Sequence, residues 1–289
     1  MKNMNLNITG HTGLLCLLGH PAKHSISPKM HNEAFSLLGL DNIYLAFDVT
    51  EAHLEEAIAS LRLFDAKGWN LTMPHKKAII PFLDEISQIS ELTESVNTVI
   101  NKNGKLYGTT TDGIGYIDSL KEKNFDISHK TITVLGAGGA AKSIIAQCAL
   151  DGAKEIFVFK RKNATFSDTV AFANEIQGET GCTVTVCDMD DKLLLKEAIQ
   201  KSQLLTNATN VGMEDDKRSL VPKEFLRKDL FVSDIIYHPA MTTLLNDAKD
   251  VGATYLNGEY MLLYQGAAAF ELWTGQKMPV EEIKRRVFQ

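Results

Sequence analysis

A glycine-rich turn near the middle of the chain constrains the fold more than any other feature. Residues 131–141 read TITVLGAGGAA, an apolar run followed by three glycines among small residues. In a strand-turn-helix unit of this kind the first glycine allows the tight bend, the second lets the backbone approach a pyrophosphate, and a small residue permits close helix packing. Gly136, Gly138 and Ala141 hold these three positions.

The residues around this turn predict a dinucleotide-binding unit. Residues 141–152 read as a helix and residues 155–161 as a second strand, which completes a unit of about 30 residues. Free N–H groups at the helix start would hold the anion. The turn residues predicted to contact a cofactor are Gly136, Ala137, Gly138, Gly139 and Ala140. A glycine turn with a purely structural role is the alternative.

Composition places the chain among ordinary globular proteins with room for two cores. It has 289 residues, of which 44% are hydrophobic and 23% charged. A net charge of −6 argues against a nucleic-acid partner. The basic run KRR at 284–286 is predicted to be a solvated helix face. No apolar stretch reaches the ~18 residues of a membrane span, and no signal peptide is visible.

The cysteines and histidines indicate neither disulfides nor a metal site. The four cysteines form no CxxC pair, so we expect buried, reduced thiols in a cytoplasmic protein. The eight histidines show neither an HExxH motif nor close His/Cys spacing, which predicts no metal.

Alternating strand-like and helix-like runs predict an α/β protein with largely parallel pairing. A hairpin turned at Asn103 and Gly104 interrupts this rhythm, and residues 78–86 read as helical. The apolar run 259–275 reads as a helix buried on several sides that crosses back to the first domain. We therefore expect an N-terminal α/β domain from residues 1–117 and 258–289, a doubly wound Rossmann-type domain from 118–257, and a cleft between them.

Three polar clusters follow predicted strands of the first domain. They are HSISPKMH at 24–31, NLTMPHK at 70–76, and the residues around Asn97 and Asp112. Ser27 precedes Pro28, so one interpretation makes Ser27 a helix N-cap. In the other, Ser25 and Ser27 hold a substrate carboxylate at the helix start.

Lys76 and Asp112 offer an ammonium and a carboxylate at strand ends. Such a pair can move a proton to or from a substrate hydroxyl. Each residue also has an ordinary explanation, because Lys76 would be unremarkable as a solvated surface lysine and Asp112 as a turn or capping residue before Gly113. The sequence leaves both interpretations open.

The order of these motifs resembles that of the shikimate dehydrogenases, including the quinate/shikimate dehydrogenase branch. HSISPKMHN, NLTMPHK, SVNT, TTDG, GAGGAA, DIIY and NGEYMLLYQGA stand in the family's order from about residue 15 to 285. The resemblance implies an oxidoreductase that reversibly reduces 3-dehydroshikimate to shikimate with a nicotinamide cofactor, in the chorismate route to aromatic amino acids. A homodimer is also expected.

The resemblance also implies roles for individual residues. Lys76 would be the proton donor and acceptor, assisted by Asp112, and Ser25 and Ser27 would hold the substrate carboxylate. The ring hydroxyls would be bound by Asn70, Thr72, Asn97, Asp112 and Gln265. Tyr237 would contact substrate, for which the alternative is an aromatic that only packs, and Ile235 and Gly258 would approach the nicotinamide.

Two departures from the family pattern bear on specificity. Thr110 stands where the family often has Asn, so that contact is either absent or made by a hydroxyl. Met73 in MPHK resembles the quinate/shikimate branch, whereas Asn70 and Thr72 resemble the shikimate-specific pattern.

Cofactor choice depends on the end of the second strand of the dinucleotide unit. An acidic residue there would bind the ribose 2′-hydroxyl of NAD, but the sequence places Lys160, Arg161, Lys162 and Asn163. Basic side chains suit a 2′-phosphate, which favours NADP. Three alternatives remain open. The cofactor could be NAD, the substrate could be quinate, and the protein could be a sensor that binds its ligands without turnover.

Overall fold

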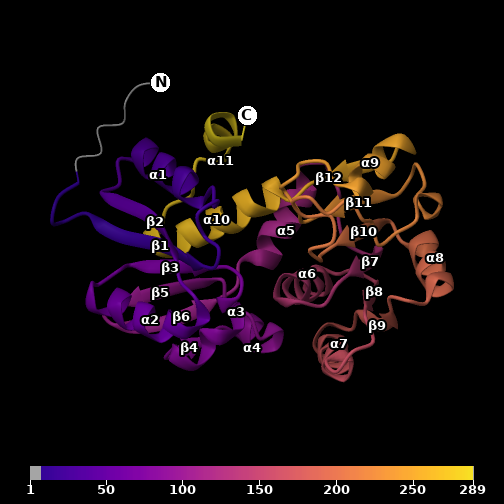
Figure 1. Ribbon diagram of the computed structural model, residues 1–289, viewed down its shortest axis with the longest axis horizontal. Helices are drawn as coiled ribbons and strands as arrows, with labels where there is room; N and C mark the ends of the chain where they lie inside the picture. Colours follow the sequence, from indigo (N-terminus) through magenta and orange to yellow (C-terminus); the bar gives the residue numbers. More distant parts are fainter. Residues whose placement is uncertain (1–7, 289) are drawn as a thin grey trace. The chain divides into compact units, whose positions relative to one another are not determined.

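The computed structural model describes residues 8–288, which form two compact units (Figure 1). The first unit holds the chain up to Thr111 and again from Leu263, and the second holds Asp112–Leu262. The sequence had placed these boundaries after residues 117 and 257. Helix α5 (Asp112–Lys121) belongs wholly to the second unit because it packs on α6, where a Cβ on Gly113 would lie 2.6 Å from the carbonyl oxygen of Ser143.

The first unit is built on a six-stranded sheet of order β2-β1-β3-β5-β6-β4. Its strands are β1 (Gly13–Gly19), β2 (Asn42–Asp48), β3 (Gly68–Leu71), β4 (Glu85–Ile86), β5 (Thr98–Lys102) and β6 (Lys105–Thr109). Strands β2, β1 and β3 are parallel, and β5 runs antiparallel to β3 and β6. The predicted hairpin is confirmed: Asn103 and Gly104 have φ of 56° and 83°, the positive values that a type I′ turn requires.

Helices of the first unit surround this sheet or pack on one another. They are α1 (Ser27–Leu38), α2 (Leu54–Leu63), α3 (His75–Ala78), α4 (Gln88–Thr93) and α11 (Val280–Ile283). Helix α1 packs against β2, α4 against β6 and α11 against α1. Leu54, Ile58 and Leu61 of α2 follow helical spacing and join the core around Trp69 of β3. Helix α10 (Glu259–Thr274) begins in the second unit and ends in the first, in agreement with the predicted crossing helix.

Residues 78–86 differ from the helix that their sequence suggested. Helix α3 ends at Ala78, a 3₁₀ turn covers Ile80–Phe82, and Glu85–Ile86 form strand β4 beside β6. Pro81 lacks the N–H that a continuing helix would use. The backbone of Asp84 donates to the carbonyl of Leu106, and the Asp84 carboxylate accepts from the Leu106 N–H at 2.7 Å, so pairing with the sheet edge decides the conformation.

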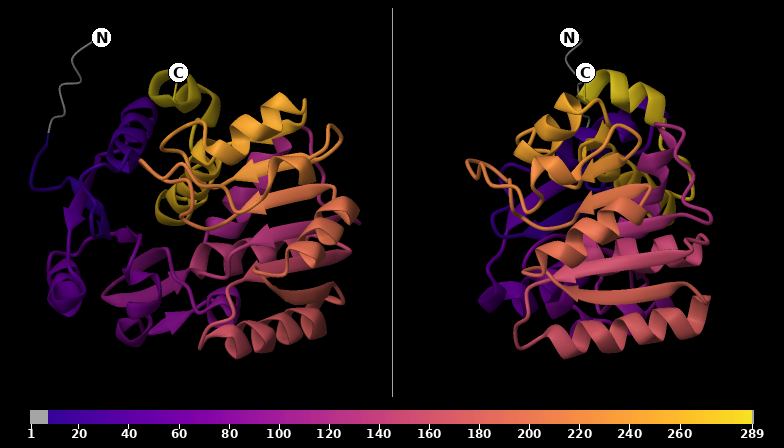
Figure 2. Two further views of the ribbon diagram at one scale, coloured as in Figure 1. Left: turned by 45° about the vertical axis from the view of Figure 1, so that its right-hand side comes forward. Right: turned by 90° about the vertical axis from the view of Figure 1, so that its right-hand side faces the viewer.

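The second unit is a doubly wound domain with a wholly parallel sheet of order β12-β11-β10-β7-β8-β9 (Figure 2). This is the 3-2-1-4-5-6 arrangement of dinucleotide-binding folds. The strands are β7 (Thr131–Leu135), β8 (Glu155–Lys160), β9 (Thr183–Asp188), β10 (Leu204–Asn207), β11 (Phe231–Asp234) and β12 (Thr254–Leu256). The predicted Rossmann-type topology is confirmed.

Four further helices cover this sheet: α6 (Gly139–Leu150), α7 (Phe166–Thr180), α8 (Lys192–Lys201) and α9 (Thr243–Asp250). The sequence reasoning overlooked α7, whose buried stripe is narrow: Thr169, Phe172, Ala173 and Ile176 among polar neighbours.

Cysteine burial agrees with the sequence. All four cysteines are free and buried, and burial raises the pKa of each thiol, which leaves them protonated and unreactive. Within residues 8–288, no helix has the length and apolarity of a membrane span, and no group of three potential metal ligands occurs.

The KRR run differs from its prediction at one residue. Arg285 and Arg286 are exposed and pair with Glu282. Lys284 is buried, with its Nζ 5.3 Å from the centre of the Tyr264 ring, because its aliphatic stem packs while the ammonium meets an aromatic face.

Candidate functional site

A buried hydrogen-bond network holds Asn70 in the first unit. The hydroxyl of Tyr44 donates to Asn70 Oδ1 at 2.7 Å, and Asn70 Nδ2 donates to the Asn97 carbonyl at 3.0 Å and to Thr98 Oγ1 at 3.1 Å. Asn70 is only 4% exposed. Its amide therefore joins β2, β3 and β5, with both N–H donors engaged and one acceptor lone pair left for another group.

The same network continues to helix α10 through Asn97 and Thr111. Asn97 Nδ2 donates to Thr111 Oγ1 at 3.0 Å and to Gln265 Oε1 at 3.2 Å, while Asn97 Oδ1 accepts the Thr111 N–H at 2.9 Å. Thr111 Oγ1 also lies 3.0 Å from the Gln265 carbonyl oxygen. Two predicted site residues, Asn97 and Gln265, are thus brought into contact, and Thr111 is a partner that the sequence reasoning missed.

The ring of His31 stacks on that of Tyr44, whose hydroxyl belongs to this network. The His31 ring lies 4.3 Å from the ring of Tyr44, nearly parallel to it. Burial lowers the pKa of His31 to about 3, so the ring is neutral and packs as an aromatic side chain. Both His31 and Tyr44 are fully buried, and they form a rigid support behind Asn70.

The serines of the first cluster are arranged differently from the predicted cap. Helix α1 begins at Ser27, its N-cap is Ile26, and no side chain caps it. Instead, Ser25 Oγ accepts the Ser27 N–H at 3.2 Å. The interpretation of Ser27 as the N-cap is therefore wrong. The chain already has helical angles at Ile26, and the side chain that accepts a backbone N–H here is that of Ser25.

Lys76 and Thr72 lie on a well-anchored segment after β3. The Lys76 carbonyl accepts the Val96 N–H at 2.8 Å, and His75 Nε2 lies 2.7 Å from the Val49 carbonyl oxygen. The Thr72 N–H donates to the Leu18 carbonyl at 3.0 Å. Lys76 is half-buried. These backbone contacts fix short helix α3, so the position of the lysine stem is determined by the fold.

Asp112 is the first residue of α5, in the second unit, and it is 4% exposed. A carboxylate in the first turn of a helix is stabilised by the N–H groups and dipole there. Thr110 is also buried, two residues earlier.

The glycine turn of the second unit has the geometry that its sequence predicted. Gly136 has φ of +109°, and a Cβ there would lie 2.8 Å from the Ala208 carbonyl oxygen, so a side chain would be strained and would clash. Gly138 precedes α6, and a Cβ there would meet open space. Ala141 is fully buried. The turn therefore leaves room in front of the helix start for an anionic group.

The remaining predicted turn residues are partly accessible. Ala137, Gly139 and Ala140 are all half-buried. The N–H groups at the start of α6 lack intrahelical partners by the geometry of a helix.

The basic run after β8 divides into two parts. Lys160 Nζ donates to the carbonyl and hydroxyl of Thr165, at 2.8 and 2.7 Å, and Asn163 Oδ1 accepts from the Thr165 hydroxyl at 3.1 Å. Lys160 and Asn163 therefore shape this turn. Arg161 and Lys162 are exposed and extend from it.

Two strand ends of the second unit carry a buried network that the sequence reasoning missed. Asn207 Nδ2 donates to Asp234 Oδ1 at 3.0 Å, and Thr242 Oγ1 donates to Asp234 Oδ2 at 2.8 Å. Burial raises the pKa of Asp234 to about 6, although its hydrogen bonds oppose this. An Asn-Ala-Thr run and an aspartate, each ending an apolar strand, are the only sequence signals for this network.

Ile235 and Tyr237 follow β11, and Gly258 follows β12. The Gly258 N–H donates to the Ile236 carbonyl at 3.0 Å, and a Cβ on Gly258 would lie 2.0 Å from the Ile235 carbonyl oxygen. Tyr237 is 42% exposed, and partial burial raises its pKa. Only glycine permits this approach of residue 258 to β11.

Comparison with known proteins identifies the family. Residues 17–99 match the shikimate dehydrogenase substrate binding domain, and residues 258–288 match the shikimate 5'-dehydrogenase C-terminal domain. A protein of Listeria innocua named shikimate dehydrogenase (NADP(+)) is 46% identical over 97% of both chains. The chain belongs to the shikimate dehydrogenase family. A shikimate dehydrogenase (NADP(+)) of Streptococcus uberis is 45% identical over 99% of this chain and 98% of its own.

Solved structures of the family have the same fold. Shikimate 5-dehydrogenase from Listeria monocytogenes, in complex with shikimate and NAD, superposes with a TM-score of 0.91 at 45% identity, covering 96% of this chain and 97% of its own. A shikimate dehydrogenase in complex with NADP⁺ gives 0.88 at 36% identity, covering 97% and 96%. The predicted α/β fold, with a substrate-binding domain and a Rossmann-type domain, is thereby confirmed.

Proposed function

We propose that this protein reversibly reduces 3-dehydroshikimate to shikimate with NADP(H), on the route to chorismate and the aromatic amino acids. The full-length match at 46% identity to a shikimate dehydrogenase (NADP(+)) carries this proposal. The predicted site residues support it because they occur on anchored elements of the two units. The substrate-binding part would be the first compact unit, up to residue 111 and again from residue 263, and the cofactor-binding part would be the second unit, residues 112–262.

Lys76 and Asp112 would carry the proton chemistry. Reduction of a ketone places negative charge on its oxygen, so a cation that can also release a proton is required beside that atom. Lys76 has this chemistry, and Asp112 would orient the same hydroxyl.

The polar residues of the first unit would bind the rest of the substrate. Ser25 and Ser27 lie at the start of α1, where hydroxyls and the helix dipole suit a carboxylate. Thr72, Gln265 and Tyr237 would contact the substrate directly. Asn70 and Asn97 donate their amide protons within the first unit, and so would mainly fix the neighbouring groups. Asn70 would also offer an acceptor, whereas Asn97 Oδ1 already accepts from Thr98 and Thr111.

The second unit fits a dinucleotide, which would supply or accept the hydride when bound. Gly136, Gly138 and the start of α6 would receive the pyrophosphate. Arg161 and Lys162 would face the adenosine ribose, with Lys160 and Asn163 holding their turn, and Ile235 and Gly258 would lie toward the nicotinamide. NADP is the proposed cofactor because no acidic residue ends β8.

Oxidation of quinate or shikimate with NAD is the second candidate. It is favoured by two relatives: the Listeria monocytogenes enzyme was solved with NAD, and a quinate dehydrogenase from Corynebacterium glutamicum, also with NAD, gives a TM-score of 0.84 at 27% identity over 95% of this chain and 98% of its own. Steady-state kcat/KM for shikimate and quinate, each with NADP and NAD, decides between the two candidates. A highest value for the quinate and NAD pair would overturn the first.

Substitution of the proposed acid and base provides the sharper test. Lys76→Met should lower kcat by roughly 10²–10⁴-fold and change KM for shikimate only a few-fold, since the lost group acts in the transition state. Asp112→Asn should damage both parameters. Lys77→Met, the adjacent exposed lysine that pairs with Glu94, is the matched control. A folded Lys76→Met variant with nearly normal kcat would contradict the proposed role.

Location and assembly complete the proposal. Buried, unpaired cysteines support a cytoplasmic protein. A homodimer is supported by Leu45 and Phe47, two exposed apolar side chains on edge strand β2. Light scattering after size-exclusion chromatography would show whether the molar mass is twice that of the chain.

A further inference from the structure

We propose that Lys142 is a second cation for the 2′-phosphate of NADP, acting beside Arg161, and that it helps to distinguish NADP from NAD. This inference rests on the proposed function, because it assumes that the second unit binds NADP. The proposal adds a residue of α6 to the group that binds the 2′-phosphate. The sequence had placed that whole group at the end of β8.

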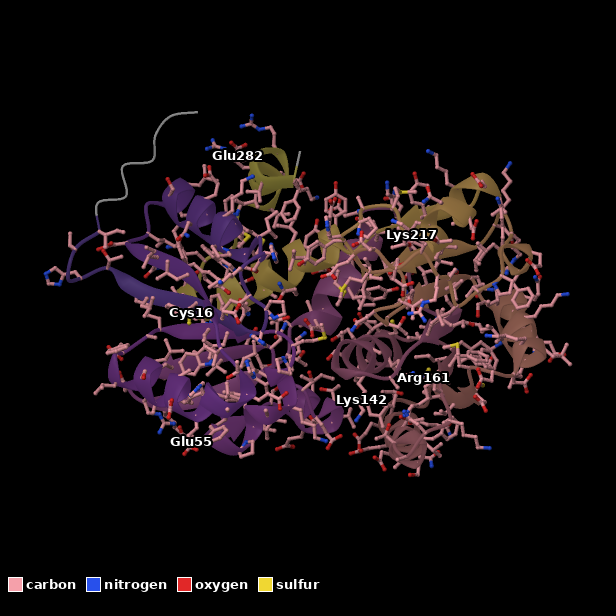
Figure 3. All side chains as sticks on the ribbon, viewed as in Figure 1. Cys16, Glu55, Lys142, Arg161, Lys217 and Glu282 are labelled. Atoms are coloured by element: carbon pink, nitrogen blue, oxygen red, sulfur yellow. The ribbon has the colours of Figure 1, made fainter. Side chains whose placement is uncertain are left out.

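The position of Lys142 connects the glycine turn with the basic turn. It lies in the first helical turn of α6, where its backbone N–H donates to the Gly138 carbonyl at 2.8 Å. Its ammonium lies 5.2 Å from the centre of the Phe172 ring on α7, the helix that follows the basic turn. Lys142 thus extends from the pyrophosphate side of the turn toward the segment that receives the ribose. Figure 3 labels Lys142 and Arg161 on this part of the second unit.

Electrostatics also place Lys142 and Arg161 in one positive region. Burial lowers the pKa of Lys160, and the charges of Lys142 and Arg161 lower it further, against the opposing effect of Asp168. Both cations therefore act on the same point at the end of β8. A phosphate carries up to two negative charges, so its binding would relieve the repulsion among these side chains.

Lys160 itself is less suited to the phosphate. Two of its three donors bind the carbonyl and hydroxyl of Thr165. Moving Lys160 onto a ligand would break the turn that presents Arg161. Lys142 and Arg161 come from two different elements, and their contact with the phosphate would leave the bonds between Lys160 and Thr165 in place.

The simpler explanation is that Lys142 only fastens α6 to α7 through its contact with Phe172. The chain offers a matched control for this, because Lys196 of α8 lies over the Phe225 ring at 5.9 Å in the same unit. A purely structural contact predicts that Lys142→Met and Lys196→Met behave alike, with modest losses of stability. The proposed role predicts a specific effect on ligands that carry the 2′-phosphate.

The test is calorimetric titration with 2′,5′-ADP and with 5′-AMP, which differ only in the 2′-phosphate. Lys142→Met should weaken 2′,5′-ADP binding by about tenfold, as expected for one charge-assisted contact, and 5′-AMP binding much less. Lys142→Arg should restore most of the preference. Thermal melting of each variant would confirm that it is folded, and Lys196→Met should retain the wild-type ratio of the two dissociation constants.

Two outcomes would separate the inference from the proposed function. If the wild-type protein binds 2′,5′-ADP no more tightly than 5′-AMP, the NADP assignment itself fails, and this inference with it. If the wild type prefers 2′,5′-ADP and folded Lys142→Met keeps that preference, only the role of Lys142 is refuted. Equal weakening of both ligands would assign Lys142 to packing or to the pyrophosphate instead.

Discussion

Removal of the Tyr44 hydroxyl should destabilise the first unit without changing its shape. The hydroxyl donates to Asn70 Oδ1 at 2.7 Å, and both side chains are buried. Tyr44→Phe keeps the ring that stacks on His31 and removes only the donor. Water cannot replace that donor at a buried site, so the Asn70 oxygen would lose a partner inside the unit.

The expected loss follows from this geometry. Leaving a buried acceptor unsatisfied costs ~1–3 kcal/mol, and we expect about 2 kcal/mol here because Asn70 keeps its two donor bonds. For a unit of this size such a loss lowers Tm by about 4–8 °C. The remaining donor bonds should hold the amide in place, so the overall fold of the unit should persist.

Tryptophan fluorescence isolates this effect, because the only two tryptophans of the chain, Trp69 and Trp273, both belong to the first unit. A thermal melt monitored by the fluorescence of these two tryptophans therefore reports the unfolding of the first unit. Tyr107→Phe, which removes the hydroxyl of a half-buried ring on β6, is the control and should change stability by less than about 0.5 kcal/mol. A Tyr44→Phe melt within 1–2 °C of wild type, on the order of the control, would refute the argument for the Asn70 network.

Four other expectations can be checked in the same preparations. Arg161→Ala should raise KM for NADP by roughly tenfold and KM for NAD much less, and equal increases would remove its link to the 2′-phosphate. Ser25→Ala should raise KM for shikimate and lower stability by ~1 kcal/mol, because Ser25 Oγ holds the Ser27 N–H, whereas Ser27→Ala should affect KM alone; unchanged KM in both would place the carboxylate elsewhere. The pKa of Asp234 is raised from 3.8 to about 6, so the folded state holds this proton more tightly than the unfolded state, and stability from it should be lost as pH rises from about 4 through 6. Asp234→Asn should flatten that part of the unfolding free energy against pH, and a variant with the same slope would show that another group is responsible. Gly258→Ala should reduce expression of folded protein, as judged by circular dichroism, since its Cβ would lie 2.0 Å from a backbone oxygen; a normally stable variant would mean that β11 can shift.

The sequence predicted those parts of the fold that depend on local chemistry. The hairpin at Asn103 and Gly104 needs positive φ at both residues, and the bend at Gly136 needs the same freedom, so residue type alone indicates them. Residues 78–86 were misassigned because their conformation depends on pairing with β6, far along the chain. Helix α7 was overlooked because few of its residues are apolar.

The candidate site, like the fold, could be predicted from the sequence only in part. Residues at predicted strand ends, such as Asn97 and Lys76, could be proposed from motifs and family resemblance. Their partners could not, because Tyr44 and Thr111 reach Asn70 and Asn97 only once separate strands and a helix have been placed side by side. Lys142 was missed for a similar reason, since its direction toward Phe172 depends on how α6 packs against α7.

The division of the chain between the two units has a consequence for biosynthesis. The second unit is one uninterrupted stretch, Asp112–Leu262, and a ribosome delivers all of it before the first unit has its last residues. The first unit requires Gln265, which joins Asn97, and Trp273, whose Nε1 donates to the Val99 carbonyl at 2.9 Å. The nucleotide domain can therefore complete its sheet on the nascent chain before Gln265 and Trp273 have been synthesised, and until then Asn97 and Val99 do not have these two contacts. A chaperone would be most needed during that interval.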